Sequence, residues 1–313
     1  MHLLRGLHNP GVAETGCVAT IGNFDGIHKG HQSIIERVIA KANTLDLPSL
    51  VLVFEPQPLE FFKDAAAPAR LTSFREKYER LAELGLDYLC CLRFDRTFAR
   101  YSADDFILEV LVKHLRTKHL VVGDDFRFGG DRLGDFALLN QAGEKFGFNV
   151  ENTQTLIAES DKSDHVATRV SSTLVRKALS KGDFKSVTRH LGHPYSIKGR
   201  VMHGQKLGRT LGFPTANVAL KRRVSPLHGV YAVRMRVGAH VHAGVANVGV
   251  KPTLGHNRPN LEVHLFDFEG DLYGANVQVE FVAKLREEQR FSGLDALKEQ
   301  IASDVKAAKA ALT

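Results

Sequence analysis

The sequence predicts an α/β domain with a parallel sheet, followed by a smaller antiparallel β-barrel domain, in a chain of 313 residues. In the first half, short apolar runs alternate with amphipathic runs, which is typical of a parallel sheet with helices on both faces. After residue 192, short apolar runs follow one another without a helical pattern between them, which indicates an antiparallel sheet or small barrel. The length suits about two domains, and we expect the boundary between residues 187 and 188.

The composition is that of an ordinary globular protein, with 43% hydrophobic and 25% charged residues. The sequence has no apolar run of about 18 residues, so it predicts no transmembrane helix. Residues 1–6 are too few and too polar for a signal peptide, and we expect a cytoplasmic protein. The three cysteines, Cys17, Cys90 and Cys91, lie in apolar runs without metal-ligand spacing, which favours structural thiols in the core.

The formal net charge of +7 permits nucleic-acid binding, but the basic residues are spread along the chain. The one dense cluster, Lys221-Arg222-Arg223, is typical of a solvated loop. Anionic small substrates such as nucleotides explain the basic balance equally well.

The stretch from Gly22 to His31 has the pattern of a phosphate-binding turn. An apolar run at 17–21 precedes it and an amphipathic run at 33–45 follows it, so the order is strand, glycine-rich turn, helix. Such a turn directs backbone N–H groups and the positive end of a helix dipole to one point, and its glycines let an anion come close. His28 and His31 add donors on the same side. The string H-x-G-H in this setting is more specific than the glycines or the histidines alone, and it differs from a Walker loop.

Further elements complete the first half. We expect strands at 50–54, 88–92 and 119–123, and helices at 74–84, 103–115 and 133–146, with Ser102 as the N-cap of the second helix. Because ligands bind beyond the carboxyl ends of parallel strands, the loop from Gly123 to Gly129 is a second candidate site. Asp124 and Asp125 in this loop suit a metal or a substrate, and they suit a turn equally well.

A last helix of this half begins at Ser171-Ser172-Thr173. Hydroxyls at a helix start are ordinary caps, and beside a phosphate-binding site they are also phosphate donors. Arg176, one turn further along, would reach the same anion.

Taken in order, these motifs resemble the first domain of the bifunctional bacterial riboflavin kinase / FAD synthetase family, whose H-x-G-H string is the adenylyl- and cytidylyltransferase signature. The segments that match are Gly22 to His31, Phe54-Glu55-Pro56, Arg70-Leu71-Thr72, Gly123 to Gly129 and Ser171 to Arg176. The resemblance implies a Rossmann-like nucleotidyltransferase domain that adenylylates FMN to FAD with ATP and releases pyrophosphate.

The resemblance also implies roles for individual residues. His28 and His31 would hold the ATP phosphates during the transfer. The remaining ATP-binding residues would be Gly22, Asn23, Phe24, Asp25, Gly26, Gly30, Ser172, Thr173 and Arg176. The flavin-binding residues would be Asp124, Asp125 and Phe126.

The second half begins with a short helix ending at Leu191 and a linker, Gly192-His193-Pro194. We expect strands at 195–197, 229–233, 242–250, 261–268 and 275–282, and a closing amphipathic helix at 294–312. The chemistry concentrates in residues 199–217. Glycines at 204, 208 and 212 form a loop that either closes over phosphates or is a plain barrel turn. Thr215 and Asn217, two residues apart, would offer two hard oxygen ligands on one face of a strand, although lone Thr-x-Asn pairs are common.

This half resembles the riboflavin kinase family, a six-stranded barrel that phosphorylates riboflavin with ATP. The matching segments are the loop through Asn217, Gly229-Val230-Tyr231, Asn247-Val248-Gly249, Glu262-Val263-His264 and Asp271 to Gly274. The resemblance implies that Gly204, Gly208, Gly212, Thr215 and Asn217 bind ATP, that Thr215 and Asn217 hold Mg²⁺, and that Glu262 is the catalytic base. Lys251-Pro252-Thr253 departs from the Arg-Pro-Thr of the family, and lysine lacks the forked geometry of arginine.

The hypothesis is therefore a two-domain enzyme that converts riboflavin to FMN and FMN to FAD, with ATP, riboflavin and FMN as partners and neither nucleic acid nor membrane. Alternatives are a protein that keeps one of the two activities, a flavin carrier without turnover, and a nucleic-acid-binding barrel. The barrel lacks the interleaved aromatic and basic pattern of base stacking, and the chain has no tryptophan. The oligomeric state does not follow from the sequence.

Overall fold

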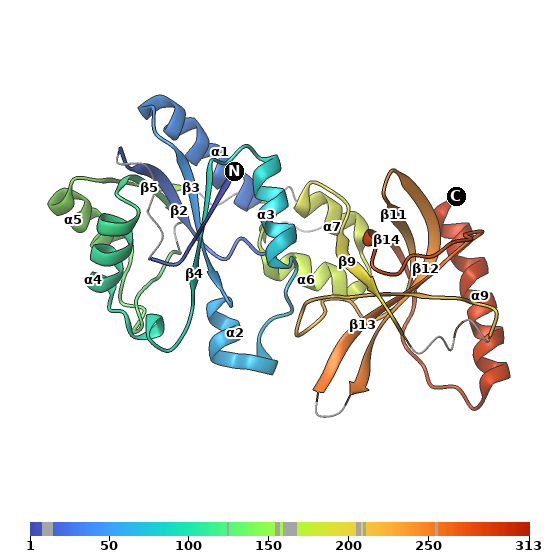
Figure 1. Ribbon diagram of the computed structural model, residues 1–313. Coiled ribbons are helices and arrows are strands. Elements are labelled where there is room, and N and C mark those ends of the chain that lie inside the picture. The colour runs from blue at the N-terminus through green and yellow to red at the C-terminus, as the bar shows by residue number, and fades with distance from the viewer. Residues whose placement is uncertain are drawn as a thin grey trace. The chain divides into compact units, whose positions relative to one another are not determined.

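The computed structural model describes residues 1–7, 15–123, 125–153, 157–158, 168–204, 208, 211–253 and 256–313. The side chains of residues 65, 157–158, 168–169, 251–253 and 256–258 lie outside this description. The chain divides into two compact units, one made of residues 1–68 and 74–171 and the other of residues 69–73 and 172–313 (Figure 1). The boundary that we expect at 187/188 stays a prediction.

The first unit contains a six-stranded sheet in the order β1-β4-β3-β2-β5-β6, and all of its strand pairs are parallel. Its strands are β1 (His2–Arg5), β2 (Cys17–Ile21), β3 (Ser49–Glu55), β4 (Tyr88–Arg93), β5 (Thr117–Gly123) and β6 (Asn149–Thr153). Two short strands, β7 (Ile157–Ala158) and β8 (Thr168–Arg169), pair separately. The parallel sheet is confirmed, and β1 and β6 at its edges are additions to the strands predicted.

Helices cover both faces of this sheet, because alternate side chains of each buried strand point to opposite faces (Figure 1). Val18 of β2 packs with Val38 and Ala42 of a helix on one face. Its neighbour Ala19 packs with Leu111 and other residues on the opposite face. The helical segments of the unit are α1 (Lys29–Leu45), α2 (Pro58–Lys63), η1 (Asp64–Ala66), α3 (Phe74–Glu83), η2 (Phe98–Arg100), α4 (Ala103–Asp105), η3 (Phe106–His114) and α5 (Phe136–Phe146).

Two predicted helices differ in detail. Ser102 is the N-cap expected, in a capping box with Asp105, but the segment continues as a π-helix, η3, whose end is closed by the Leu115 N–H on the Val110 carbonyl. The helix predicted from residue 133 begins at 136 instead, because Asp135 caps it and Gly134 pairs with Phe128.

The second unit contains a closed barrel in the order β10-β13-β12-β11-β14-β9, which confirms the predicted six-stranded antiparallel barrel. Its strands are β9 (Ser196–Met202), β10 (Ala216–Val218), β11 (Gly229–Val237), β12 (His240–Thr253), β13 (His256–Leu265) and β14 (Asn276–Arg286). Its helices are α6 (Ser172–Lys181), α7 (Phe184–Leu191) and α9 (Leu294–Leu312).

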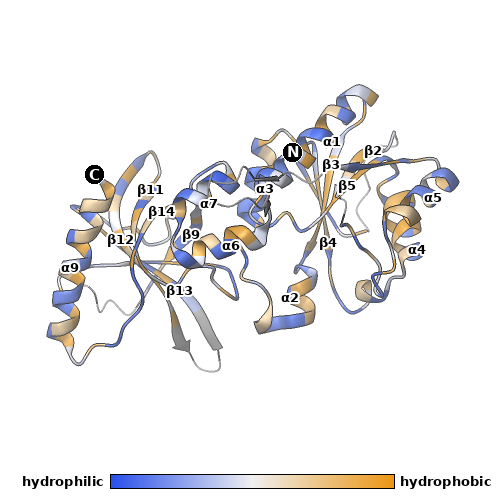
Figure 2. Ribbon diagram, turned by 180° about the vertical axis from the view of Figure 1, so that it is seen from behind, coloured by the Kyte–Doolittle hydropathy of each residue, from blue (hydrophilic) through white to orange (hydrophobic). Residues whose placement is uncertain are grey.

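The barrel interior continues into a helical cap. Leu179 of α6 and Phe184 of α7 belong to the same buried cluster as Tyr231 and Phe281 of the barrel. Helix α9 instead packs on the outer face, where Ala308 meets Val230. The mixed hydropathy colours along α9 agree with a helix that has one face in contact and the other in solvent (Figure 2).

One prediction about a loop is wrong, and the prediction of buried structural thiols is confirmed for two cysteines. Arg222 is buried, and its guanidinium donates to the Leu71 carbonyl at 2.9 Å, so the basic cluster around it is not simply a solvated loop. Cys17 and Cys90 are buried free thiols, as predicted, and burial raises the pKa of each to about 12. Among the residues that the structure describes, no helix combines the length and the apolarity needed to cross a bilayer.

Candidate active sites

The turn from Gly22 to His28 joins β2 to α1 at the carboxyl edge of the sheet. In the strand order, the chain moves from β2 toward β3 on one side and returns to β5 on the other. Ligands of open parallel sheets bind at such a reversal point. The turn therefore occupies the expected ligand position.

The two histidines of the turn form one rigid unit. His28 is the N-cap of α1, and its Nδ1 accepts the His31 N–H at 3.3 Å. The rings of His28 and His31 stack with centroids 3.7 Å apart. His28 is 6% exposed, and a Cβ at Gly30 would lie 3.2 Å from its Nδ1. Glycine at position 30 thus leaves room for the His28 ring.

Several side chains of the same turn are buried in the core. Phe24 and Ile27 are 1% and 0% exposed, and both have positive φ angles, 45° and 43°. Such φ angles are rare for large side chains and persist where the surrounding structure enforces them. Asp25 and Gly26 are also buried. The core therefore holds the turn in one conformation.

The loop after β5 lies at the same sheet edge, because β5 pairs with β2 in parallel. Asp125 is exposed, Phe126 is half-buried, and Asp124 lies outside the described residues. The rings of Phe126 and Phe128 stack at 5.5 Å. Flavin contacts for these residues stay a prediction.

Aromatic rings form an extended cluster that the motifs did not identify. It begins at the carboxyl end of β3, where Phe54 contacts the rings of Phe94 and Phe98. The rings of Phe61 and Phe62 in α2 contact that of Phe94, and Phe62 is 61% exposed. The available sequence signal is the phenylalanine content, 19 residues in a chain without tryptophan. A partly exposed aromatic surface at this edge suits a flat ring.

Ser172, Thr173 and Arg176 lie in the first turns of α6, in the second unit. The Arg176 Nε donates to the Ala69 carbonyl at 2.6 Å within that unit. Their assignment to ATP stays a prediction.

On the barrel, three polar side chains occupy one row across adjacent strands. Asn217 of β10 pairs directly with Glu262 of β13, and Glu262 pairs directly with Asn247 of β12. Their chain neighbours Val218, Leu261, Val263, Ala246 and Val248 are in the barrel core. Alternation therefore puts the row on the outer face. Glu262 also accepts a hydrogen bond from the Asn260 amide at 2.9 Å.

Gly204 and Gly208 lie close to Asn217 and Thr215, respectively. A Cβ at Gly204 would overlap the side-chain amide of Asn217. A Cβ at Gly208 would overlap the Phe213 carbonyl and lie 3.4 Å from the Thr215 Oγ1. Gly212 has a φ of 86°, which favours glycine. The absence of a side chain at Gly204 and Gly208 therefore leaves room for Asn217, the Phe213 carbonyl and Thr215. The assignment of the three glycines to ATP stays a prediction.

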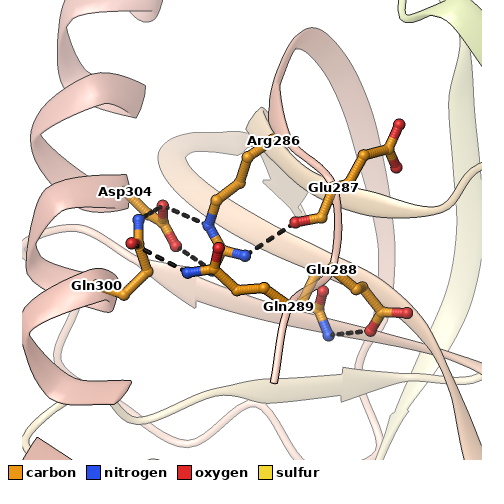
Figure 3. Close-up of polar contacts among 7 residues, drawn as sticks. Arg286, Glu287, Glu288, Gln289, Gln300 and Asp304 are labelled. Atoms are coloured by element: carbon orange, nitrogen blue, oxygen red, sulfur yellow. Dashed lines mark hydrogen bonds and ion pairs between the residues drawn. The ribbon is translucent and has the colours of Figure 1, made fainter. Parts of the chain in front are cut away.

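The segment after β14 brings a second carboxylate, that of Glu288, to the row, which the motifs missed. Figure 3 shows this segment beside Gln300 and Asp304 of α9. The Asn247 amide donates to Glu288 at 3.3 Å, and a Cβ at Gly249 would overlap the Glu288 carboxylate. The segment is held by Arg286, which donates to both carboxylate oxygens of Asp304 in α9 at 2.9 and 2.7 Å. Gln300 donates to the same carboxylate at 2.9 Å. The contact between β14 and α9 thus positions Glu288.

Each unit has a cavity among its described residues. One of about 90 Å³ lies beside Thr215 and is lined mainly by apolar residues. The other, about 460 Å³, lies beside Pro48 and Asp87 at the amino ends of β3 and β4. Parallel sheets bind ligands at the opposite edge, so the larger cavity is not our candidate site.

The described residues contain no cluster of three or more His, Cys, Asp or Glu side chains placed to hold a metal. Mg²⁺ in phosphoryl-transfer sites takes one or two protein oxygens and completes its coordination with phosphates and water. The oxygens of Thr215 and Asn217 fit that smaller requirement.

Comparison with known proteins assigns a family to each half of the chain. The family model of FAD synthetase matches residues 12–173, and that of riboflavin kinase matches residues 191–312. A bifunctional riboflavin kinase/FMN adenylyltransferase of Escherichia coli (strain K12) is 52% identical over 306 residues, which span 97% of this chain and 96% of the relative. The chain belongs to the bifunctional riboflavin kinase/FMN adenylyltransferase family.

Other members extend over the same length. The enzyme of that name from Haemophilus influenzae is 48% identical and covers 99% of both chains. A crystal structure from Streptococcus pneumoniae, described as a macrolide-efflux protein, has a TM-score of 0.79 and 28% sequence identity over 99% of both chains. Its shared fold includes the parallel sheet and the barrel, and its efflux description concerns that protein.

Proposed function

We propose that this chain makes both flavin cofactors, phosphorylating riboflavin to FMN with one ATP and adenylylating FMN to FAD with a second. Family membership over nearly the whole chain supports both activities. The observation that carries the proposal is that one chain has a histidine turn at the sheet reversal point and a carboxylate row against a glycine loop on a barrel. Because both reactions consume ATP, we place the enzyme in the cytoplasm.

In adenylyl transfer, a phosphate oxygen of FMN attacks the α-phosphorus of ATP, and pyrophosphate leaves. FMN brings its own nucleophile, so no covalent enzyme intermediate is needed. Negative charge increases on the phosphoryl oxygens in the transition state, and donors already in place lower the barrier. We assign this role to His28 and His31, whose stacked rings hold each other in position.

The flavin ring of FMN needs a flat apolar surface at the same edge. Phe126 with the rings around Phe54 and Phe94 supplies one. Stacking on such rings positions the FMN phosphate without using a charged group near the reacting atoms.

In the kinase reaction, the terminal ribityl hydroxyl of riboflavin attacks the γ-phosphorus of ATP. Glu262 accepts the hydroxyl proton as the new O–P bond forms, which makes a weak nucleophile reactive. Thr215 and Asn217 would hold Mg²⁺, which neutralises charge on the ATP phosphates. Asn260 orients the Glu262 carboxylate through its hydrogen bond.

Incubation with riboflavin, ATP and Mg²⁺ tests the proposal, with products separated by chromatography over time. We expect FMN to appear first and FAD to follow, and pyrophosphate to form in step with FAD. If FMN forms but FAD does not, the protein has only the kinase activity. If riboflavin binds but is not converted, the protein is a flavin carrier.

A further inference from the structure

Lys77 of α3 is 0% exposed, which is rare for lysine because burial of an ammonium group is costly without hydrogen-bond acceptors. Its Nζ donates to the Asn23 carbonyl at 2.6 Å. Asn23 lies in the turn that carries His28 and His31. A buried charge thus contacts the backbone of the proposed nucleotide site.

A second side chain makes the equivalent contact further along the turn. The Gln32 Nε2 donates to the Ile27 carbonyl at 2.8 Å. Lys77 and Gln32 come from different helices, α3 and α1. The Asn23 carbonyl directly precedes Phe24, and the other carbonyl belongs to Ile27; these are the two residues of the turn other than glycine that have positive φ angles.

Because the peptide bond is planar, a hydrogen bond to its carbonyl also fixes the direction of its N–H group. In a planar trans peptide the C=O and the following N–H point in opposite directions. A donor on the Asn23 carbonyl therefore turns the Phe24 N–H away from Lys77, and a donor on the Ile27 carbonyl turns the His28 N–H away from Gln32. Backbone N–H groups so oriented at a helix start bind phosphate.

We propose that Lys77 is a positioning residue for adenylyl transfer, and that together with Gln32 it fixes two peptide planes so that their N–H groups face the ATP phosphates before ATP binds. The positive charge of Lys77 lies behind the turn and adds to the attraction for the same anion. This inference rests on the proposed adenylyltransferase function.

The test replaces Lys77 with methionine, which keeps a straight side chain of similar length but removes the charge and the donor. We expect the dissociation constant for pyrophosphate, measured by calorimetry, and the ATP KM of FMN adenylylation to rise about tenfold or more. FMN affinity should stay within about twofold, and riboflavin phosphorylation by the same chain should be unchanged. Arg75→Met is the matched control, because Arg75 lies on the same helix, has a side chain 72% exposed, and loses the same charge.

If Lys77 only stabilises the fold, the expected result is different. In that case Lys77→Met would weaken FMN and pyrophosphate binding together or would change neither, and either result overturns the proposal. If Lys77→Met does not fold, Gln32→Leu decides, since it removes the second carbonyl donor without changing the charge. Pyrophosphate affinity unchanged in Gln32→Leu would also overturn the proposal. A wild-type protein that makes no FAD would instead refute the proposed function itself.

Discussion

Gly204 lies in the proposed kinase site, where a Cβ would overlap the Asn217 amide. We expect Gly204→Ala to displace Asn217 and to lower riboflavin phosphorylation at least about tenfold, because displaced ligands lose transition-state contacts. FMN adenylylation should be unchanged. Gly293→Ala is the control, because a Cβ at Gly293 meets open space. Equal phosphorylation rates in the two variants would show that Asn217 does not need its present position.

His119 is a second residue with a measurable signature, because burial lowers its pKa below the usual 6.5 despite a hydrogen bond with Glu151. The folded state thus keeps His119 neutral where the unfolded chain takes up a proton. Its contribution to stability is complete above pH 6.5 and is lost as the pH falls toward the lower folded-state pKa.

Glu151 adds a further loss of stability at lower pH, where its carboxylate takes up a proton. Burial alone would raise the Glu151 pKa, but hydrogen bonds from Arg37 and His119 lower it below its usual 4.5. Denaturant midpoints between pH 7 and pH 5 should fall less steeply in His119→Gln than in the wild type. Parallel slopes would mean that His119 does not titrate on unfolding.

Among the elements, the attachment of α9 to β14 depends on the ion pair of Arg286 and Asp304, whose side chains are 20% and 7% exposed (Figure 3). Arg286→Met should lower the free energy of unfolding of the second unit by about 3 kcal/mol, because it leaves a buried carboxylate without its cation. Arg286→Met with Asp304→Leu should recover much of that loss. A double variant as unstable as the single one would mean that packing, rather than charge, holds α9.

The sequence predicts most elements because their apolar patterns are clear, as in the short buried run of β2 and the helical spacing of apolar residues in α9. It missed β1 and β6, whose edge positions leave exposed and half-buried residues without a clear pattern. It also missed the π-helix η3, since apolar spacing does not distinguish π from α hydrogen bonding.

The candidate site residues also fall into two groups, those that local motifs identify and those that only the folded structure reveals. Local motifs are enough to propose His28, Thr215, Asn217 and Glu262 as site residues, and in the structure Asn217 lies directly opposite Glu262. Lys77 and Glu288 reach their sites through tertiary contacts with residues 54 and 41 positions away, respectively. No local pattern reports such contacts.

For the whole molecule, the packing of α6 and α7 predicts how the second unit can be isolated. Val175, Leu179, Phe184 and Val187 are buried with the barrel core. Each such side chain contributes about 1.5–3 kcal/mol. We therefore expect a fragment of residues 172–313 to be more stable to denaturant than one of residues 188–313. Equal midpoints would indicate that the barrel does not need these helices and would favour the boundary at 187/188.

If this chain has two separate sites, variants that each lack one of them should complement each other when mixed. Glu262→Gln keeps the shape of the side chain but cannot accept a proton, so it should convert FMN to FAD while making almost no FMN from riboflavin. His28→Ala should make FMN from riboflavin but lose about a hundredfold or more in FAD formation. Neither variant alone should make appreciable FAD from riboflavin and ATP, whereas a mixture of the two should, because FMN released by one is the substrate of the other. Wild-type riboflavin phosphorylation by Glu262→Gln, or wild-type FMN adenylylation by His28→Ala, would contradict the account.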